Sequence, residues 1–171
     1  LIPTKLKKLI KDFTPIAKYL AKKISSVNSC YFIGRNISYP IALEGSLKLK
    51  EISYLHSEGF PGGEMKHGPI ALIDKDTMTV CINPNNELYE KSLSNAQEIS
   101  ARNGKIIILT SVNRTKKGGT EMKVPSLPKE NFIDTPFIYS IPLQLISYYF
   151  ALNEGTDIDQ PRNLAKSVTV E

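Results

Sequence analysis

Three short apolar runs, separated by segments with helical periodicity, constrain what this chain can fold into. They are CYFIG at 30–34, TMTVCIN at 77–83 and KIIILTS at 105–111. The last run is apolar at consecutive positions, which is typical of a strand with both faces buried. Strands that alternate with helices form a parallel, doubly wound sheet. The sequence therefore predicts an α/β fold with about four or five parallel strands and helices on both faces of the sheet.

Two helices are predicted before the first strand. Residues 4–13 have the apolar periodicity of one helix. Thr14 is a suitable N-cap, and Pro15 suits the first position of a second helix, which we expect to end near Ser25.

The second half of the chain is predicted to add a helix, a strand and a further helix. The segment from Asn85 to Asn103 is mostly helical and is closed by Gly104. MKVPSL at 122–127 is a candidate fourth strand. Ile141 to Leu152 forms a helix whose first turn tolerates Pro142.

Composition narrows the class of protein. The 171 residues, 41% hydrophobic and 23% charged, suit one globular domain with a substantial core. No apolar run approaches the roughly 20 residues of a membrane span, and no signal peptide is recognisable, so we expect a cytoplasmic protein. Cys30 and Cys81 are expected to be buried thiols in strands. His56 and His67 are the only histidines, which argues against zinc. No metal or cofactor is expected, and the leucine at residue 1 suggests a fragment.

The net charge of +5 is concentrated at the N-terminus. Residues 1–26 hold seven lysines and Asp12, a net charge of +6, so the remaining residues sum to −1. No aromatic residues alternate with lysines along a strand, as they do in proteins that bind single-stranded nucleic acid. The sequence therefore argues against nucleic-acid binding. A basic interaction domain formed by residues 1–26 stays open as an alternative function.

A helix with charges on its apolar side is predicted after the first strand. GRNISYP at 34–40 forms the turn, and ALEGSLKLKEISYLH at 42–56 forms the helix. This turn and SVNRT at 111–115 are candidate ligand segments, because ligands of such sheets bind at the carboxyl ends of the strands. Lys48 falls in the middle of an apolar stripe, and Glu44 and Glu51 fall on its edge. The stripe consists of Ile41, Gly45, Leu49, Ile52 and Leu55. The opposite side, which we expect to face water, consists of Ser46, Lys50 and Ser53.

Two interpretations of these charges stay open. Ion pairs on a wet helix face stabilise the helix by only about 0.2–0.5 kcal/mol each. An ionised group on a buried face costs several kcal/mol unless it is well paired. Buried charges occur both in functional sites and in structural ion-pair networks. We expect Glu44, Lys48 and Glu51 to be mostly buried or to lie at a subunit contact.

Two further segments carry candidate groups. FPGGEMKHGPIAL at 60–72 is an irregular turn, and its His67 suits acid–base chemistry if it lines one cleft with the charged helix. Taken alone, this segment is a solvated loop. Lys166 lies in the terminal RNLAKSVTVE, where a lysine is ordinarily solvated. If Leu164 and Val168 dock the tail, burial lowers the lysine pKa and makes the amine a better nucleophile.

Two long motifs carry a resemblance to a known family. ALEGSLKLKEISYLHSEGFPGGEMKHGPIALID and DQPRNLAKSVTVE closely resemble the isomerase domain of the glutamine–fructose-6-phosphate aminotransferase family, or glucosamine-6-phosphate synthases. PNNELYEKSLSNAQEI and PLQLISYYFAL fit the segments between them, so the resemblance covers essentially the whole chain. It implies a flavodoxin-like SIS subdomain, the second of two in the isomerase half of the family.

The resemblance implies an activity and roles for the charged helix. The family makes glucosamine 6-phosphate from fructose 6-phosphate, using ammonia released from glutamine. Glu51 matches the base that moves a proton between C1 and C2 of the sugar. Lys48 and Glu44 match charged groups that support this transfer.

Three further residues receive roles from the same resemblance. His67 matches the histidine that opens the sugar ring and reaches in from the neighbouring subunit. Lys166 matches the lysine that forms a Schiff base with the open-chain ketose. Ala165 matches a tail residue beside the ammonia path.

The resemblance also implies an organisation of the chain. Residues 1–14 match a connecting helix, 15–153 a SIS subdomain and 154–171 an active-site tail. The family's glutaminase domain and its first SIS subdomain, which holds the sugar phosphate, are expected as partners from a longer chain. A homodimer is expected, and the fragment alone should be inactive. The alternative is a SIS module that binds sugar phosphates without catalysis.

Overall fold

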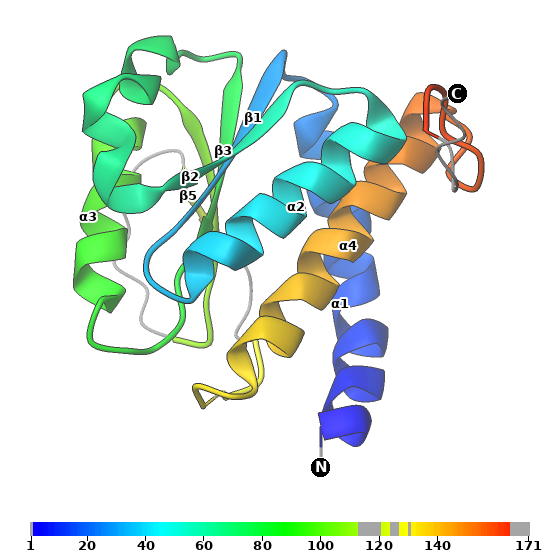
Figure 1. The fold of residues 1–171 in the computed structure, drawn as a ribbon, viewed down its shortest axis with the longest axis horizontal. Helices are drawn as coiled ribbons and strands as arrows, with labels where there is room; N and C mark the ends of the chain where they lie inside the picture. Colours follow the sequence, from blue (N-terminus) through cyan, green and yellow to red (C-terminus); the bar gives the residue numbers. More distant parts are fainter. Residues whose placement is uncertain (1, 113–120, 124–126, 130, 165–171) are drawn as a thin grey trace, which may run out of the picture.

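The structure, a computed structural model, describes residues 2–112, 121–123, 127–129 and 131–164. Its strands form one parallel sheet in the order β2-β1-β3-β4-β5 (Figure 1). The strands are β1 Ser29–Gly34, β2 Ser57–Pro61, β3 Thr77–Ile82, β4 Lys105–Leu109 and β5 Glu121–Lys123. This order is that of flavodoxin-like sheets, and the predicted parallel sheet is confirmed.

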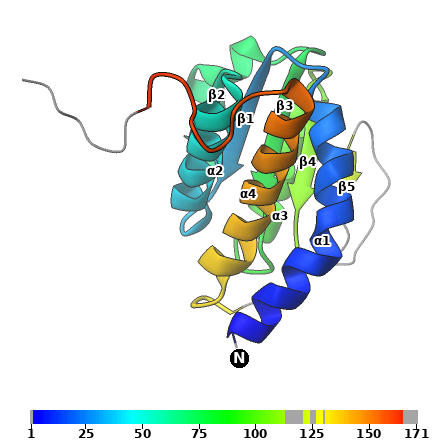
Figure 2. The ribbon, with the colours of Figure 1, turned by 90° about the vertical axis from the view of Figure 1, so that its right-hand side faces the viewer.

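Helices cover both faces of the sheet (Figures 1 and 2). One face carries α1 Ile2–Ile24, α2 Ser38–Ser53 and α4 Thr135–Glu154. The other carries α3 Tyr89–Ser100 and two short 3₁₀ helices, η1 Gly62–His67 and η2 Pro69–Leu72. The doubly wound α/β architecture predicted from the sequence is therefore confirmed.

Two separate apolar layers form the core because strand side chains alternate between the faces of a sheet. On β3, Met78 and Val80 pack beneath α1, α2 and α4, whereas Cys81 packs in the α3 layer. Cys30 and Cys81 are buried in strands, as predicted. Burial raises the pKa of the Cys30 thiol, which keeps it protonated and unreactive.

α1 is one continuous helix, so the predicted break at Thr14 is wrong. The Thr14 hydroxyl donates a hydrogen bond to the carbonyl of Ile10 at 2.7 Å and caps no new helix. Pro15 lies on the exposed side, where water can reach the backbone carbonyl that lacks its partner. Phe13 and Leu20 lie on the buried side, which packs against α4 and outweighs the proline penalty of about 3 kcal/mol. The domain boundary predicted at this proline falls inside the helix.

β2 is a strand that the sequence patterns did not predict. It pairs with β1 and forms one edge of the sheet. Gly59 and Pro61 are unfavourable in a central strand but are tolerated at an edge. The segment after β2, predicted as an irregular turn, forms the two 3₁₀ helices.

The later elements differ from their predicted bounds. α4 begins at Thr135, well before the predicted Ile141, and Pro142 therefore lies inside the helix instead of in its first turn. α3 is shorter than the predicted segment 85–103. β5 begins one residue before the predicted segment 122–127, of which residues 124–126 lie outside the described residues. Pro142 is buried in the layer between α4 and the sheet, so tertiary packing sets this helix despite the proline.

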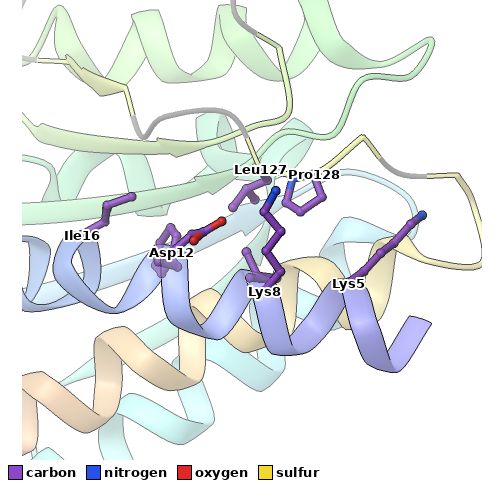
Figure 3. A pocket seen from close by; sticks show the side chains of 8 residues that line it. Lys5, Lys8, Asp12, Ile16, Leu127 and Pro128 are labelled. Atoms are coloured by element: carbon purple, nitrogen blue, oxygen red, sulfur yellow. The ribbon is translucent and has the colours of Figure 1, made fainter. Parts of the chain in front are cut away.

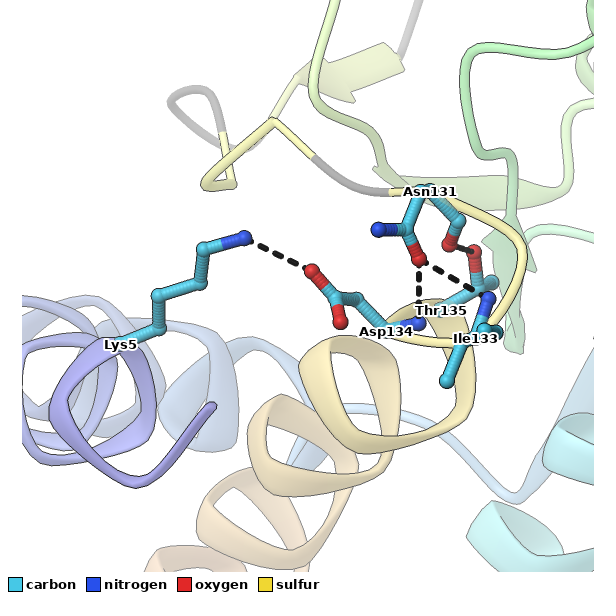
Figure 4. Close-up of polar contacts among 5 residues, drawn as sticks. All are labelled: Lys5, Asn131, Ile133, Asp134 and Thr135. Atoms are coloured by element: carbon cyan, nitrogen blue, oxygen red, sulfur yellow. Dashed lines mark hydrogen bonds and ion pairs between the residues drawn. The ribbon is translucent and has the colours of Figure 1, made fainter. Parts of the chain in front are cut away.

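Asn131 organises the start of α4 (Figure 4). Its side-chain oxygen accepts hydrogen bonds from the backbone N–H groups of Ile133 and Asp134, both at 2.9 Å. The Thr135 hydroxyl donates to the Asn131 carbonyl at 2.7 Å. The Asp134 carboxylate in turn pairs with Lys5 Nζ at 2.7 Å. This ion pair ties the beginning of α1 to the beginning of α4.

Candidate active site

The candidate site is built on α2, whose position is fixed by two glycines. A Cβ on Gly34, the last residue of β1, would overlap the carbonyl of Ser38, so only glycine lets the strand turn directly into α2. A Cβ on Gly45 would lie 2.7 Å from Leu143 of α4 and 2.9 Å from Phe32 of β1. Gly45 therefore lets α2 pack tightly between α4 and the sheet. This packing decides which side of α2 stays accessible.

The three charged residues predicted on α2 form one cluster. Lys48 Nζ lies 2.9 Å from Glu51 Oε2 and 4.0 Å from Glu44 Oε1. The side chains of Lys48, Glu51 and Glu44 are 35%, 28% and 40% exposed. Each side chain is therefore more than half covered within the single chain, which does not contradict the prediction that the three are mostly buried. The alternative, a subunit contact, stays a prediction.

The buried side of α2 is rotated from the predicted apolar stripe. Ser46 and Ser53 were expected to face water, but both are buried. Ser57 at the start of β2 donates a hydrogen bond to the Ser46 carbonyl at 2.7 Å. The Ser53 hydroxyl donates to the carbonyl of Leu49 within the helix. The edge strand β2 covers this side of α2, and the charged cluster turns away from the sheet.

The charged cluster adjoins an apolar groove of about 360 Å³. Its lining combines residues of α1, α2 and α4, namely Ile10, Lys48, Ile52, Ile141, Gln144, Leu145, Ser147 and Tyr148. Lys48 is the charged residue of this lining. Apolar walls exclude water and strengthen electrostatic interactions beside them. One side of the cluster thus faces the apolar groove, and the other side faces solvent.

Lys48 is held in its charged form. The hydrogen-bonded Glu51 carboxylate raises the pKa of Lys48, against a smaller opposing effect of burial, and Glu44 adds to the rise. A lysine with a raised pKa is a poor amine nucleophile because it stays protonated. Lys48 is therefore suited to stabilising negative charge.

His67 does not join this cluster. It ends η1, which packs with Met65 in the α3 layer on the other face of the sheet. Its side chain is 74% exposed, and its nearest charged neighbour is Glu64 at 3.9 Å. The expectation that His67 and the charged helix line one cleft is therefore wrong within one chain. Its expected role in a neighbouring subunit stays a prediction.

The carboxyl ends of β1 and β3 meet at a topological switch point, where such sheets commonly bind ligands. The turn after β1, predicted as a ligand segment, does lie there. Arg35 Nε donates to Asn95 Oδ1 of α3 at 3.0 Å and closes the crevice, which also contacts Gly62 and Ser92. The crevice has no room for a water molecule. The second predicted segment, SVNRT, lies mostly outside the described residues.

A second cavity, of about 410 Å³, lies between α1 and residues 127–128 (Figure 3). Lys8 and Asp12 of α1 point toward it above an apolar floor that includes Phe13. No predicted site residue lines it. The cavity is therefore separate from the candidate site on α2.

Lys166 and Ala165 lie outside the described residues, which end at Leu164. The segment just before them is anchored to α2. The backbone N–H of Arg162 donates to Tyr54 Oη at 2.9 Å, and its guanidinium lies over the Tyr54 ring, 4.1 Å from the centroid. Sequence patterns missed these residues because no spacing links groups 108 positions apart.

The arrangement suits proton transfer with a charged lysine beside the base. Glu51 offers a partly exposed carboxylate, and Lys48 steadies the charge that develops near it. Within the described ranges, no three His, Cys, Asp or Glu side chains are arranged to hold a metal ion. None of the described helices combines the length and apolar character needed to cross a membrane.

Comparisons with known proteins place the chain in a family. The SIS domain pattern matches residues 23–154. The glutamine–fructose-6-phosphate aminotransferase of Haemophilus influenzae is 48% identical over 170 residues, which are 99% of this chain and 28% of that protein. The enzyme of the same name from Sphingobium yanoikuyae is 48% identical over 153 residues, 89% of this chain and 98% of that sequence. The chain spans little more than a quarter of the Haemophilus protein.

Solved structures agree with this placement. The C-terminal domain of glucosamine-fructose-6-phosphate aminotransferase from Francisella tularensis superposes with a TM-score of 0.81 at 38% identity, over 92% of this chain and 45% of that one. Tagatose-6-phosphate ketose/aldose isomerase from Escherichia coli gives a TM-score of 0.76 over 99% of this chain and 47% of that one. At 14% identity, that likeness shows the fold alone. The chain belongs to the SIS domain family and, within it, to the glutamine–fructose-6-phosphate aminotransferase family.

Proposed function

We propose that this chain is the second SIS subdomain, with its C-terminal tail, of a glutamine–fructose-6-phosphate aminotransferase. The parent enzyme converts fructose 6-phosphate and glutamine-derived ammonia into glucosamine 6-phosphate. The observation that carries the proposal is the Lys48–Glu51 pair, 2.9 Å apart beside an apolar groove. The 48% identity to enzymes of this name supports the assignment. That the protein acts in the cytoplasm stays a prediction.

The proposed chemistry divides between the tail and α2. The Lys166 amine attacks C2 of the open-chain ketose, and water leaves as the imine forms. Ammonia then replaces the lysine at C2. Glu51 takes a proton from C1 and returns it to C2, which converts the ketose skeleton into the aldose skeleton. Ala165 lies beside the path of the ammonia.

Lys48 and Glu44 support the proton transfer without forming bonds to the sugar. The ammonium of Lys48 stabilises negative charge as a proton leaves C1. Its raised pKa keeps it charged throughout the reaction. Glu44, at 4.0 Å from Lys48, holds the ammonium between two carboxylates. His67 of a neighbouring subunit opens the sugar ring.

The remaining parts of the enzyme are partners of this chain. A stripe of apolar side chains runs along α4, and Phe137, Tyr148 and Leu152 are exposed on it. It adjoins the groove beside Lys48. Exposed apolar side chains grouped on one helix face are typical of a protein interface. We assign this stripe to the contact with the first SIS subdomain. The glutaminase domain of the parent chain and a second copy, which completes a homodimer, are the other proposed partners.

Glu51→Gln in the full-length parent enzyme tests the proposed function. The amide keeps the shape of the side chain but cannot take a proton, so kcat should fall by about 10²–10⁴-fold. Glu90→Gln, an exposed change on α3, is the matched control and should leave the rate unchanged. The readout is glucosamine 6-phosphate formed from fructose 6-phosphate and glutamine.

Two outcomes would contradict the proposal. If Glu51→Gln retains the rate of the unmodified enzyme, Glu51 is not the base. If the unmodified enzyme binds fructose 6-phosphate but forms no product, the chain belongs to a binding module without catalysis.

A further inference from the structure

The C-terminal end of α2 holds the last described segment of the chain. Tyr54 follows α2 in the left-handed conformation, with φ 63°, and its backbone N–H closes the helix on the Lys50 carbonyl at 3.1 Å. This conformation is costly for a tyrosine. The Tyr54 side chain meets Arg162 in two ways, through its hydroxyl and through its ring. One tyrosine thus binds both the backbone and the side chain of the tail.

A second contact fixes the start of the same segment. Gly155 ends α4 with φ 70°. The hydroxyl of Thr156, the next residue, donates to the Ile52 carbonyl of α2 at 2.6 Å and also approaches the Ala151 carbonyl at 3.2 Å. Thr156 thereby satisfies a carbonyl at the open end of α2. The segment is attached to α2 at two points, residues 156 and 162.

A turn between these points directs the chain back onto α2. Asp157 Oδ1 accepts the backbone N–H groups of Asp159 at 3.0 Å and Gln160 at 2.9 Å. Such a turn is a local, preformed structure. Figure 2 shows the segment leaving α4 and passing over α2. Arg162 on this path therefore lies beside the C-terminal end of α2, the helix that carries Glu51.

Chain length alone then limits where residue 166 can lie. Tyr54 is three residues beyond Glu51, an axial rise of about 4.5 Å along a helix. Lys166 is four residues beyond Arg162, a reach of at most about 14 Å when fully extended. An anchor at Arg162 is thus compatible with the proposed position of the Lys166 amine beside Glu51. Without the Arg162 contact, Thr156 would be the last point at which the segment is attached to α2.

We propose that Tyr54, Arg162 and Thr156 form a tail clasp, a set of positioning residues that holds the C-terminal tail on α2 and delivers Lys166 to the sugar beside Glu51. The inference rests on the proposed function, because it assigns these residues to the Schiff-base step. The clasp touches neither the substrate nor the reacting atoms. It raises the effective concentration of the amine at C2.

Amide hydrogen exchange of the C-terminal peptide, measured by mass spectrometry on the full-length parent enzyme, tests whether the clasp exists. Tyr54→Phe removes the oxygen that accepts the Arg162 N–H but keeps the ring, so exchange in the peptide that contains Arg162 should rise moderately. Tyr54→Leu removes both contacts and should raise it further. Leucine and tyrosine are both disfavoured at positive φ, so the substitution does not change the energy of the backbone conformation at position 54.

Kinetics test whether the clasp positions the amine. In Tyr54→Leu, kcat and the rate of borohydride trapping of fructose 6-phosphate on Lys166 should fall about tenfold. The KM for fructose 6-phosphate should stay nearly constant, because the sugar phosphate is held by another subdomain. Arg162→Gln should behave similarly, and Arg162→Lys should restore much of the loss because the cation over the Tyr54 ring returns. A purely structural role would not produce this rescue.

Control variants distinguish failure of the clasp from failure of the proposed function. Tyr19→Leu, an exposed change on α1, and Arg102→Gln, two residues after the end of α3, should change neither exchange nor kcat. If Tyr54→Leu fails to fold, the exposed Arg162→Gln gives the same test. Unchanged exchange in both variants would contradict the clasp. Raised exchange with unchanged kcat and trapping would contradict its positioning role. Absence of trapping in the unmodified enzyme would instead overturn the proposed function itself.

Discussion

At the scale of single residues, the two lysines proposed for the site have opposite tasks. Lys48 is held 2.9 Å from Glu51, and this contact raises its pKa. A Schiff base requires a neutral amine, whereas an ordinary lysine, with a pKa of about 10.4, is already almost wholly protonated at neutral pH. At neutral pH, Lys48 is therefore neutral, as a Schiff base requires, even less often than an ordinary lysine. This reasoning assigns the nucleophile to Lys166 and the electrostatic role to Lys48.

The raised pKa of Lys48 is measurable by NMR titration of its side-chain carbon in this chain. The midpoint should lie above the ordinary value of about 10.4, so stability from the pair is present below that pH and is lost as pH rises through the raised pKa. Glu51→Gln should lower the midpoint toward the ordinary value. Glu44→Gln should lower it less, because Glu44 lies 4.0 Å away. A midpoint that does not move in Glu51→Gln would contradict the pairing.

At the scale of elements, the sequence predicted what local patterns determine and missed what packing determines. Long apolar runs predicted β1, β3 and β4 because central strands are buried on both faces. β2 was not predicted, because Gly59 and Pro61 are not typical of a strand and this strand lies at the edge of the sheet. The continuity of α1 through Pro15 depends on its packing against α4, which no local signal reports. The same holds for the buried Ser46, which faces a strand that was not predicted.

Pro15→Ala tests whether packing holds α1 together against an unfavourable residue. Alanine restores the backbone N–H that can bond to the Lys11 carbonyl and removes the clash of the ring. The free energy of unfolding, measured in denaturant, should rise by about 1–3 kcal/mol. Pro136→Ala is the control, because Pro136 lies in the first turn of α4, where no intrahelical N–H bond is lost. Equal effects of the two changes would contradict this explanation.

At the scale of the whole molecule, one chain carries only part of the proposed site. The cluster on α2 was found from the sequence because Glu44, Lys48 and Glu51 interrupt an apolar helix. His67 lies on the other face of the sheet, so its proposed role at the cluster requires a neighbouring subunit. The contact between Tyr54 and Arg162 joins positions too distant for any pattern. The proposed site thus depends on assembly of subunits, a quaternary event, and on docking of the tail, a tertiary one.

Subunit mixing tests the proposed sharing of His67. Glu51→Gln and His67→Asn full-length enzymes should each be inactive, and a mixed dimer should have one intact site. Random exchange at equal amounts makes half of the dimers mixed, so activity should recover to about a quarter of the unmodified level. Lack of recovery, with exchange verified by mass spectrometry, would show that His67 acts within its own chain.

Borohydride trapping most directly tests the division of labour between the tail and α2. Full-length enzyme is reduced in the presence of fructose 6-phosphate, and the labelled peptide is identified by mass spectrometry. We expect one sugar adduct, on Lys166, which Lys166→Arg abolishes because arginine keeps the charge but forms no imine. An adduct on Lys48, or one that persists in Lys166→Arg, would contradict the assignment of Lys166 as the nucleophile and of Lys48 as the charge beside the base.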